Sequence, residues 1–470
     1  MMSKTLSGEE SRMKGQWMNR SILIIAPNFP PEDQVGAYRV YRLAKYLPHL
    51  GWKPYVLTVD INYRHREDYS LLENLPPEVE IHRARNIEPT TRGVRMALGG
   101  VDTTAAAMQR RGQVAATPVG GVESAALPLG RRVASGALDL IRTRWLFNPD
   151  IFATWYLPAI RKARHLIRDH DIPLVFSTQP DFTGHWIAST LQNEGVKWVA
   201  DVRDPSGYLM RPSERFWDRG YYRRRELERH TVTHADAVTV ASEGIGMILA
   251  DMYKPGNIKR WQFIPTGIDE ELLPKQASDP FCDVPYLLYP GNVFPEYGSQ
   301  FMRIFAQSLR NESVRNSGVK LVIAGEFTRN APVVAPLARE LEIEDHVTLV
   351  DRLPQSKVLE ALSGAVAGVL MTGREVRWWC LHAKAVEYMA LRKPVIAVVP
   401  ELSESRLWLE KTGLGVFLDG DISAAATTLS DFILHRDPKP EPNDSECDRF
   451  LASRQAESFA SLFDQIVGDT

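Results

Sequence analysis

Lys384 and Glu387 are the two charged residues whose spacing first suggests chemistry. They lie in "WWCLHAKAVEYMALRKPVIAVVP" (378–400), a helix-period segment followed by an apolar β-branched run. Residues three apart share one face of a helix. An ammonium near a helix start can neutralise phosphate oxygens, and a carboxylate can accept two hydrogen bonds from vicinal hydroxyls such as a ribose diol. The same spacing also forms ordinary exposed ion pairs on helices.

A second charged group follows a strand in "VADVRDPSGY". Asp201 and Asp204 bracket Arg203 at the end of the predicted strand 197–202. Ligands of doubly wound sheets bind outside the carboxyl ends of strands, so these side chains are candidates for a site. Asp204 precedes a proline, which favours an extended backbone there. One of the two carboxylates could instead simply pair with Arg203.

Two helix starts add further candidates. His185, in "DFTGHW", begins the helix after strand 173–178, although a lone histidine is also commonly structural or on the surface. Gly36 and Arg39 open the helix after the first strand, and a helix N-terminus suits an anionic or hydroxylated ligand. Gly36 could equally serve only a tight turn. The absence of G-x-G-x-x-G disfavours a dinucleotide dehydrogenase.

Two strands in the second half of the chain end in glycine. Gly291 and Asn292 close "YPGN", and Gly325 and Glu326 close "IAGE". Glycine lets a ligand approach the backbone closely, but it also makes ordinary strand-to-helix turns. Each turn alone is therefore a weak indication of a site.

A repeated strand–helix pattern must position these residues. Apolar strands at 21–27, 54–59, 173–178 and 197–202 alternate with helical segments, and a second run of the same kind begins near 286. This alternation predicts an α/β fold with two Rossmann-like, doubly wound parallel-sheet domains. Two such halves facing each other would form an interdomain cleft.

The domain limits follow from where this pattern starts and fails. The region from about 88 to 135 is rich in Gly, Ala, Thr and Val without a period, which predicts a mobile insertion. We expect a disordered tail at 1–20, an N-terminal domain at 21–275, a C-terminal domain at 276–440 and a C-terminal helix at 441–470.

Composition excludes several classes of protein. A chain of 470 residues is too long for one core, and a net charge of -2 gives no field that favours nucleic acid. Cys282, Cys380 and Cys447 have neither metal-site spacing nor a disulfide pattern, which fits a reducing compartment. No signal peptide or membrane-spanning run is evident. We therefore expect a cytoplasmic protein.

The segment 210–230, "MRPSERFWDRGYYRRRELERH", places Arg211, Arg215, Arg219 and Arg223 at steps of four among aromatic residues. This pattern is typical of a solvated helix face. It is also typical of a peripheral contact with an anionic membrane surface, here on the inner face of the membrane.

Taken in order, several segments resemble the retaining GT-B glycosyltransferases of family 4, especially their bacterial cell-surface polysaccharide branch. The resemblance covers about 21–435, and its segments are "ILIIAPNFPPEDQVGAYRVYRLAKYLPHLGWKPYVLT", "FSTQPDFTGHWIAS", "WVADVRDP", "ADAVTVAS", "FIPTGID", "YPGN", "VKLVIAGE" and "HAKAVEYMALRKPVIAV". It implies a GT-B fold, with the donor mainly on the C-terminal domain and final helices that cross back to the N-terminal one.

The resemblance also implies an activity. Such enzymes move a hexose-type sugar from a nucleotide-diphosphate sugar to a hydroxyl of a lipid-linked or glycan acceptor, with retention and without a metal or other cofactor. They act in exopolysaccharide, lipopolysaccharide or other glycoconjugate biosynthesis. The alternatives are a related nucleotide-sugar epimerase or hydrolase, and a non-catalytic GT-B-like scaffold or regulatory subunit.

By the same resemblance, Glu387 holds the donor ribose and Lys384 lies near the donor diphosphate. Gly36 and Arg39 face the acceptor and the phosphates. Asp204 and His185 lie on loops that approach the transferred sugar or the acceptor, and together with Lys384 they are the candidate catalytic residues.

The sequence departs from the family pattern at two places. Trp379 stands eight positions before Glu387, where the family often has a glutamate that addresses the donor sugar. The arginine and lysine that commonly follow the glycine of "YPG" are absent here. Diphosphate charge must then be met by Lys384 together with Arg374, Arg377 or Arg329.

Overall fold

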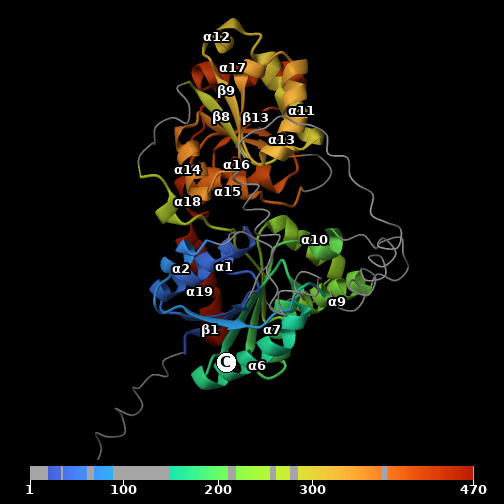
Figure 1. Cartoon of the computed structure of the whole chain (residues 1–470), viewed down its shortest axis with the longest axis vertical. Coiled ribbons are helices and arrows are strands. Elements are labelled where there is room, and N and C mark those ends of the chain that lie inside the picture. Colours follow the sequence, from blue (N-terminus) through green and yellow to red (C-terminus); the bar gives the residue numbers. More distant parts are fainter. Residues whose placement is uncertain are drawn as a thin grey trace, which may run out of the picture. The chain divides into compact units, whose positions relative to one another are not determined.

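The computed structural model describes residues 19–32, 35–60, 68–87, 149–209, 219–254, 261–275, 284–372 and 378–468. The predicted insertion at 88–135 lies outside these ranges, as does all but the end of the predicted tail. The chain divides into two compact units (Figure 1). The first contains 1–239, 248–262 and 460–470, and the second contains 240–247 and 263–459.

A seven-stranded sheet forms the centre of the first unit. Its strand order is β3-β2-β1-β4-β5-β6-β7, and the pairings recorded between β3, β2, β1, β4 and β5 are all parallel. The strands are β1 (Ser21–Ile25), β2 (Lys53–Val59), β3 (Glu80–Ala84), β4 (Leu174–Thr178), β5 (Lys197–Val202), β6 (Ala237–Val240) and β7 (Trp261–Phe263).

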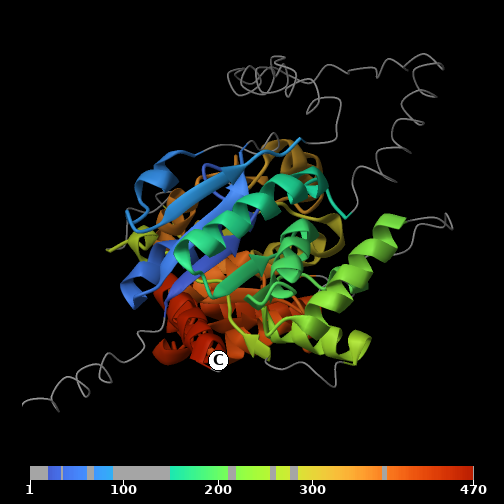
Figure 2. The same cartoon turned by 90° about the horizontal axis from the view of Figure 1, so that it is seen from below.

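Helices connect these strands and cover the sheet. They are α1 (Val35–Tyr46), α2 (Ser70–Glu73), α6 (Tyr156–His170), α7 (Phe182–Gln192), α8 (Ser206–Leu209), α9 (Arg219–His234) and α10 (Glu243–Tyr253), whose first residues up to Met247 belong to the second unit. Helix α7 contacts both α6 and α9, and Figures 1 and 2 show these three helices side by side. The last turns of α19 (Ala452–Gly468) also belong to this unit, where Phe463 packs against Trp52 and Phe176.

A six-stranded sheet forms the second unit, in the order β10-β9-β8-β11-β12-β13, and its recorded pairings are all parallel. Its strands are β8 (Tyr286–Pro290), β9 (Lys320–Ala324), β10 (Val347–Val350), β11 (Ala367–Met371), β12 (Val395–Val398) and β13 (Gly415–Phe417). Its helices are α11 (Pro295–Ser308), α12 (Glu312–Asn316), α13 (Phe327–Glu340), α14 (Gln355–Gly364), α15 (Ala383–Ala390), α16 (Glu404–Lys411), α17 (Ile422–His435) and α18 (Asp444–Asp448), followed by α19.

The apolar strands of the second unit serve two cores, one on each face of the sheet. In β8, Leu287 and Tyr289 point into one cluster, whereas Tyr286 and Leu288 point into the other. This alternation follows from the two-residue period of a strand. Both faces are covered by helices, which explains why these strands read as continuous apolar runs.

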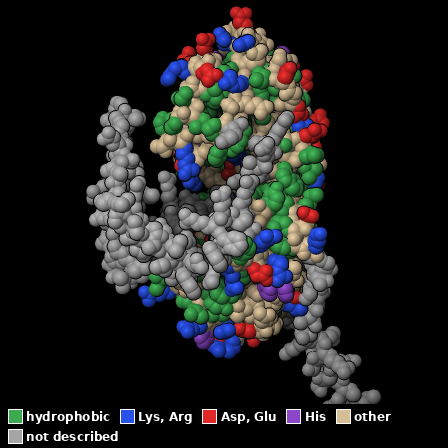
Figure 3. Space-filling view, turned by 90° about the vertical axis from the view of Figure 1, so that its right-hand side faces the viewer, with side chains coloured by type: hydrophobic (Ala, Val, Ile, Leu, Met, Phe, Trp, Pro, Cys, Tyr) green, Lys and Arg blue, Asp and Glu red, His purple; other side chains and the backbone are tan. Residues whose placement is uncertain are grey.

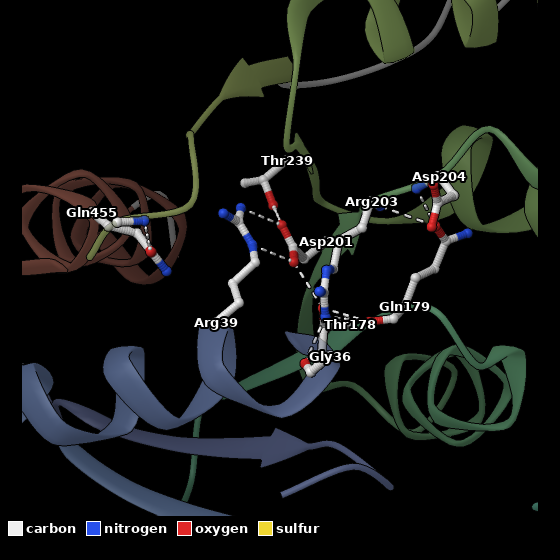
Figure 4. Close-up of polar contacts among 10 residues, drawn as sticks. Gly36, Arg39, Thr178, Gln179, Asp201, Arg203, Asp204, Thr239 and Gln455 are labelled. Atoms are coloured by element: carbon white, nitrogen blue, oxygen red, sulfur yellow. Dashed lines mark hydrogen bonds and ion pairs between the residues drawn. The ribbon is translucent and has the colours of Figure 1, made fainter. Parts of the chain in front are cut away.

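The first unit buries an ion pair at the end of its sheet. Arg39 of α1 donates from Nε and Nη2 to the two carboxylate oxygens of Asp201 of β5, at 2.9 and 2.8 Å (Figure 4). The exposed fractions of these side chains are 1% and 0%. Thr178 of β4 and Thr239 of β6 each donate a hydroxyl to Asp201 at 2.7 Å. One carboxylate therefore links α1, β4, β5 and β6.

The α/β prediction with two parallel Rossmann-like sheets is confirmed. The helix expected near 156–170 has those bounds. The suggestion that a carboxylate next to Arg203 pairs with Arg203 does not describe Asp201, because Asp201 is engaged by Arg39.

We predict that Arg39→Met lowers the free energy of unfolding by about 3–5 kcal/mol, because it leaves a buried carboxylate without its counter-charge. Burial by itself would raise the pKa of Asp201, but Arg39 and the hydroxyl donors lower it below the usual value. A depressed carboxyl pKa contributes stability above the unfolded-state pKa that is lost on acidification. The variant should therefore unfold at a higher pH on acid titration.

Urea and acid unfolding followed by circular dichroism measure both effects. Arg164→Met is the matched control, because Arg164 pairs with Glu194 on the surface and exposed pairs contribute at most about 1 kcal/mol. Equal unfolding free energies for the Arg39 variant and the parent would show that the buried pair does not hold this unit together.

Candidate functional site

Lys384, in the first turn of α15, is the central residue of the second unit's candidate site. Its ammonium lies 3.7 Å from the ring centroid of Tyr289, the penultimate residue of β8. Among the residues that the structure describes, Lys384 forms neither a hydrogen bond nor an ion pair. Burial lowers the pKa of Lys384 to about 7, although the nearby Glu387 carboxylate raises it. A cation that has no counter-ion within 4 Å among the described residues thus lies beside the end of a central strand.

The turn after β8 is shaped around this ammonium. Gly291 has a φ of +152°, a backbone conformation that residues other than glycine rarely adopt. A Cβ added at Gly291 would lie 2.8 Å from the Lys384 Nζ. A Cβ at Gly325, after β9, would collide with the carbonyl oxygen of Gly291. Both glycines therefore permit close packing, and Gly291 leaves room for the lysine.

Polar groups of the two turns hold each other in place. The Asn292 side-chain oxygen accepts a hydrogen bond from the Glu326 backbone N–H at 2.9 Å. Asn330 donates to the Gly291 carbonyl at 3.2 Å and accepts from the Val293 backbone N–H at 2.8 Å. The predicted donor-site residues Gly291, Asn292, Gly325 and Glu326 thus form one structural unit with Lys384.

Arg329 was expected to help neutralise a diphosphate. In the structure its Nε pairs with a Glu326 carboxylate oxygen at 2.8 Å, three residues away on α13. Both side chains are exposed, so this pair contributes little to stability. The other expected cations, Arg374 and Arg377, lie outside the described residues.

Glu387 lies one turn after Lys384 and is half-buried. Its Oε1 accepts a hydrogen bond from Gln355 Nε2 at 3.0 Å. Gln355 begins α14, which follows β10, so the carboxylate is oriented by a side chain from the neighbouring strand–helix connection. No sequence pattern indicated this amide partner.

Trp379 is buried, with an exposed fraction of 1%. Its carbonyl accepts a hydrogen bond from Ser242 Oγ at 2.6 Å, and a Cβ added at Gly244 would lie 2.6 Å from its Cα. The indole N–H has no hydrogen-bond partner among the described atoms. The position at which the resemblance to family 4 led us to expect a glutamate therefore carries a packed aromatic residue.

Glu404, at the start of α16, holds the segment 378–379 in place through hydrogen bonds, and it was not among the residues predicted from the sequence. Its carboxylate accepts the backbone N–H groups of Glu243 and Gly244 at 3.0 Å each and the Trp408 indole N–H at 3.0 Å. Its own N–H donates to the Trp378 carbonyl at 2.6 Å. Burial raises the pKa of Glu404 even though these hydrogen bonds lower it. The only sequence signal was a Ser-Glu pair of the kind that begins helices.

In the first unit, Gln179 organises the loop that carries Asp204 (Figure 4). Its side-chain oxygen accepts the backbone N–H groups of Arg203 and Asp204 at 2.9 and 3.0 Å. The Arg203 guanidinium turns back and donates to the carbonyls of Gly36 and Gln179 at 2.7 and 3.1 Å. One hydrogen-bond network thus connects Gly36 and Asp204 through Arg203 and Gln179. Arg39 pairs instead with Asp201.

His185 is buried in the first unit, with an exposed fraction of 1%. Its Nδ1 lies 2.7 Å from Ser177 Oγ, which also accepts the Trp198 indole N–H at 2.8 Å. Burial lowers the pKa of His185 to about 4, with a smaller opposing effect from Asp201. The imidazole is therefore neutral at pH 7. A role for His185 or Arg39 toward a substrate stays a prediction, and the contacts found are those of core residues.

A second buried carboxylate, that of Glu228, stabilises the loop that carries Asp204. Glu228 of α9 accepts the Gly207 backbone N–H at 2.9 Å and the Tyr253 hydroxyl at 2.7 Å. Burial raises its pKa. Gly207 lies three residues after Asp204, in the short helix α8. Helix α9 therefore fixes the end of this loop, which its very polar sequence did not suggest.

Within the described residues, no group of three or more His, Cys, Asp or Glu side chains is placed to hold a metal ion. No described helix combines the length and apolar character needed to cross a membrane.

These two sheets and their connections define an α/β protein of the GT-B fold, which glycosyltransferases and UDP-N-acetylglucosamine 2-epimerases share. No protein-family model matches the sequence, and no curated protein matches it.

Solved structures match nearly the whole chain. Sucrose-phosphate synthase from Thermosynechococcus elongatus has a TM-score of 0.61 at 16% identity, covering 96% of this chain and 100% of that one. WaaG, a glycosyltransferase involved in lipopolysaccharide biosynthesis, has a TM-score of 0.52 at 12% identity, covering 95% and 99%. A putative UDP-N-acetylglucosamine 2-epimerase from Listeria monocytogenes has a TM-score of 0.52 at 11% identity, covering 96% and 98%. These likenesses establish the fold.

We predict that the Lys384 ammonium titrates near pH 7 and that Glu387→Gln lowers this pKa further, because the variant removes the carboxylate that favours the charged form. Heteronuclear NMR of labelled lysine side chains, with the signal assigned by Lys384→Gln, measures the titration. Glu360→Gln, an exposed acid on α14 that pairs with Lys357, is the control and should leave the Lys384 pKa unchanged. An ordinary lysine pKa for Lys384 would contradict the burial of its ammonium.

Proposed function

We propose that this chain is a glycosyltransferase that moves a sugar from a nucleotide-diphosphate sugar to a hydroxyl acceptor. The observation that carries the proposal is the unpaired Lys384 ammonium beside the Gly291 turn, with Glu387 one helical turn away. The fold supports it, because ligands of doubly wound sheets bind at the carboxyl ends of strands, where these residues lie.

Lys384 would bind the donor diphosphate. The Lys384 side chain is half-buried and its ammonium has no counter-ion among the described residues, so a phosphate oxygen would supply the missing charge. An anion at that position raises the lysine pKa above 7. At neutral pH donor binding would therefore be accompanied by proton uptake, and affinity would fall as the pH rises above 7.

Glu387 would hold the ribose. A carboxylate has enough lone pairs to accept from Gln355 and from two vicinal hydroxyls at once. The Gln355 hydrogen bond fixes the carboxylate orientation before the donor arrives. Such preorganisation reduces the entropy that binding must overcome.

The chemical step would break the bond between the anomeric carbon and the diphosphate oxygen. The acceptor hydroxyl oxygen forms the new bond to that carbon, and its proton leaves with the departing diphosphate or with a nearby base. Lys384 stabilises the negative charge that develops on the leaving oxygen. Asp204, on a loop whose backbone Gln179 fixes, is the candidate to contact the acceptor or the transferred sugar. Retention of configuration rests on the resemblance to family 4.

A nucleotide-sugar epimerase or hydrolase is the second candidate, because an epimerase is among the proteins of the same fold. It would use the same donor half-site without an acceptor. Turnover of a nucleotide sugar by the purified protein alone would favour it. A non-catalytic scaffold is favoured by the buried Trp379, which replaces a donor-sugar contact of the related enzymes.

We predict that at least one UDP-, GDP- or dTDP-sugar raises the melting temperature of the protein, and that a donor screen with mass-spectrometric detection finds transfer to an added acceptor. Glu387→Ala should raise the donor KM at least tenfold or abolish turnover, since it removes hydrogen bonds to a ligand. Lys384→Gln should lower kcat and also remove the pH dependence of donor affinity between pH 6 and 8 that the pKa of about 7 implies.

Lys439→Gln, an exposed lysine in a connecting segment, is the control and should behave as the parent. Calorimetry in buffers of different ionisation enthalpy tests the proton uptake separately from turnover. No stabilisation by any nucleotide sugar would exclude both enzyme proposals. An unchanged donor affinity in Glu387→Ala would exclude the ribose role alone.

A further inference from the structure

Helices α6, α7 and α9 carry a surface that the proposed function does not use. We define the α6–α9 patch as Tyr156, Leu157, Arg161, Trp186, Tyr222 and Arg223. The Tyr156 and Trp186 rings stack at 4.0 Å, and the Arg223 guanidinium lies 5.1 Å from the Trp186 ring. Leu157 and Tyr222 have exposed fractions of 58% and 59%. Tyr156, Trp186 and Arg223 from three helices are thus in contact, and the exposed Leu157 and Tyr222 are the chain neighbours of Tyr156 and Arg223.

The outer face of α6 continues this pattern. The inward face buries Ala159, Ile160, Ala163 and Leu166. The outward positions, spaced by four, three and four residues, are Leu157, Arg161, Arg164 and Arg168. An amphipathic helix therefore turns a leucine and a row of arginines away from the core.

The cations of this surface are only partly neutralised. Arg164 pairs with Glu194, Arg168 with Asp169 and Arg229 with Glu226. Arg161 and Arg223 form no ion pair with any described residue. In Figure 3, Lys and Arg side chains appear together with hydrophobic, acidic and His side chains in the lower part of the view.

We propose that the α6–α9 patch docks on an anionic lipid surface. Arg161 and Arg223 attract the negative headgroups, while Leu157 and the rings of Trp186 and Tyr222 enter the interfacial layer. Amphipathic rings favour the boundary between headgroups and acyl chains. The unneutralised positive charge favours this partner over a second copy of the chain, whose identical patch would repel it.

The sequence alone pointed to a different set of arginines. Of the predicted stripe, Arg211 and Arg215 lie outside the described residues, and only the backbone of Arg219 is described. Arg223 is the member that the structure joins to the aromatic stack. The contributions of α6 and α7 come from segments more than thirty residues away in the chain, which no local pattern connects.

Sedimentation of the full chain with vesicles tests this proposal. Vesicles of phosphatidylcholine alone are compared with an equimolar mixture of phosphatidylcholine and phosphatidylglycerol. We expect binding to the anionic vesicles only, and weaker binding when salt shortens the Debye length from about 10 Å at 0.1 M to about 3 Å at 1 M. The double variant Arg161→Gln/Arg223→Gln should partition at least tenfold more weakly, since each arginine near such a surface contributes roughly fivefold.

A second variant, Leu157→Ser/Tyr222→Ser, keeps the charge and removes the apolar part. It should bind less tightly at both salt concentrations. The matched controls are Arg310→Gln/Arg339→Gln and Ile422→Ser, exposed positions on the second unit, and they should bind as the parent does. Circular dichroism and melting temperature confirm that each variant is folded.

Three outcomes would overturn the proposal. The first is an absence of binding to anionic vesicles by the parent chain. The second is equal binding by the arginine double variant. The third is a concentration-dependent dimer in sedimentation velocity that both patch variants dissociate, which would assign the surface to a second copy. Nucleotide-sugar turnover is measured in parallel, so that failure of docking and failure of the proposed activity are distinguishable.

Discussion

The first unit depends on a buried carboxylate that four elements share. Asp201 has no exposed surface, and removing a charge from water costs several kcal/mol per ion unless partners replace the solvent. Arg39 supplies the counter-charge, and Thr178 and Thr239 supply the remaining hydrogen bonds. Because these partners come from α1, β4 and β6, the carboxyl end of the sheet has a fixed arrangement. The Gln179–Arg203–Gly36 network, which carries Asp204, is built directly beside it.

In the second unit the central charged residue, Lys384, has no counter-ion among the described residues. The Lys384 ammonium lies over the Tyr289 ring and next to Gly291. Within the described part of the chain, no carboxylate lies within ion-pair distance of it. Glu387 is near enough to raise the lysine pKa, but the carboxylate itself is oriented by Gln355. A satisfied ion pair in the first unit stabilises the fold, whereas an unsatisfied cation in the second is suited to a ligand that brings negative charge.

Helix α9 shows how one element can serve two purposes. Its buried Glu228 holds the Gly207 end of the Asp204 loop, and its exposed Arg223 joins the aromatic stack on the outer surface. The helix has too few apolar residues to bury a broad face, so a carboxylate with specific hydrogen bonds replaces part of that packing. Helix α9 therefore contributes both to the α6–α9 patch and to the support of the loop that carries Asp204.

The alternation of strands and helices was enough to predict the fold class, and it indicated the segments that carry the candidate site residues. Strand and helix periods depend on local chain geometry, so the parallel sheets and the Lys384–Glu387 helix face could be predicted from spacing alone. For the carboxylates around Arg203, the sequence offered pairing with Arg203 itself, whereas the structure pairs Asp201 with Arg39. Resemblance to related enzymes pointed to Trp379 as unusual.

The partner of each charged residue, by contrast, depends on the assembled fold. Arg39 and Asp201 are 162 positions apart, and Glu404 reaches Gly244 across 160 positions. The sequence placed His185 among the candidate catalytic residues, and only the fold shows that its imidazole is buried, which lowers its pKa to about 4. Burial and long-range pairing depend on how strands and helices assemble rather than on local sequence. They distinguish Arg39, which pairs with a carboxylate, from Lys384, whose ammonium pairs with no carboxylate in the described part of the chain.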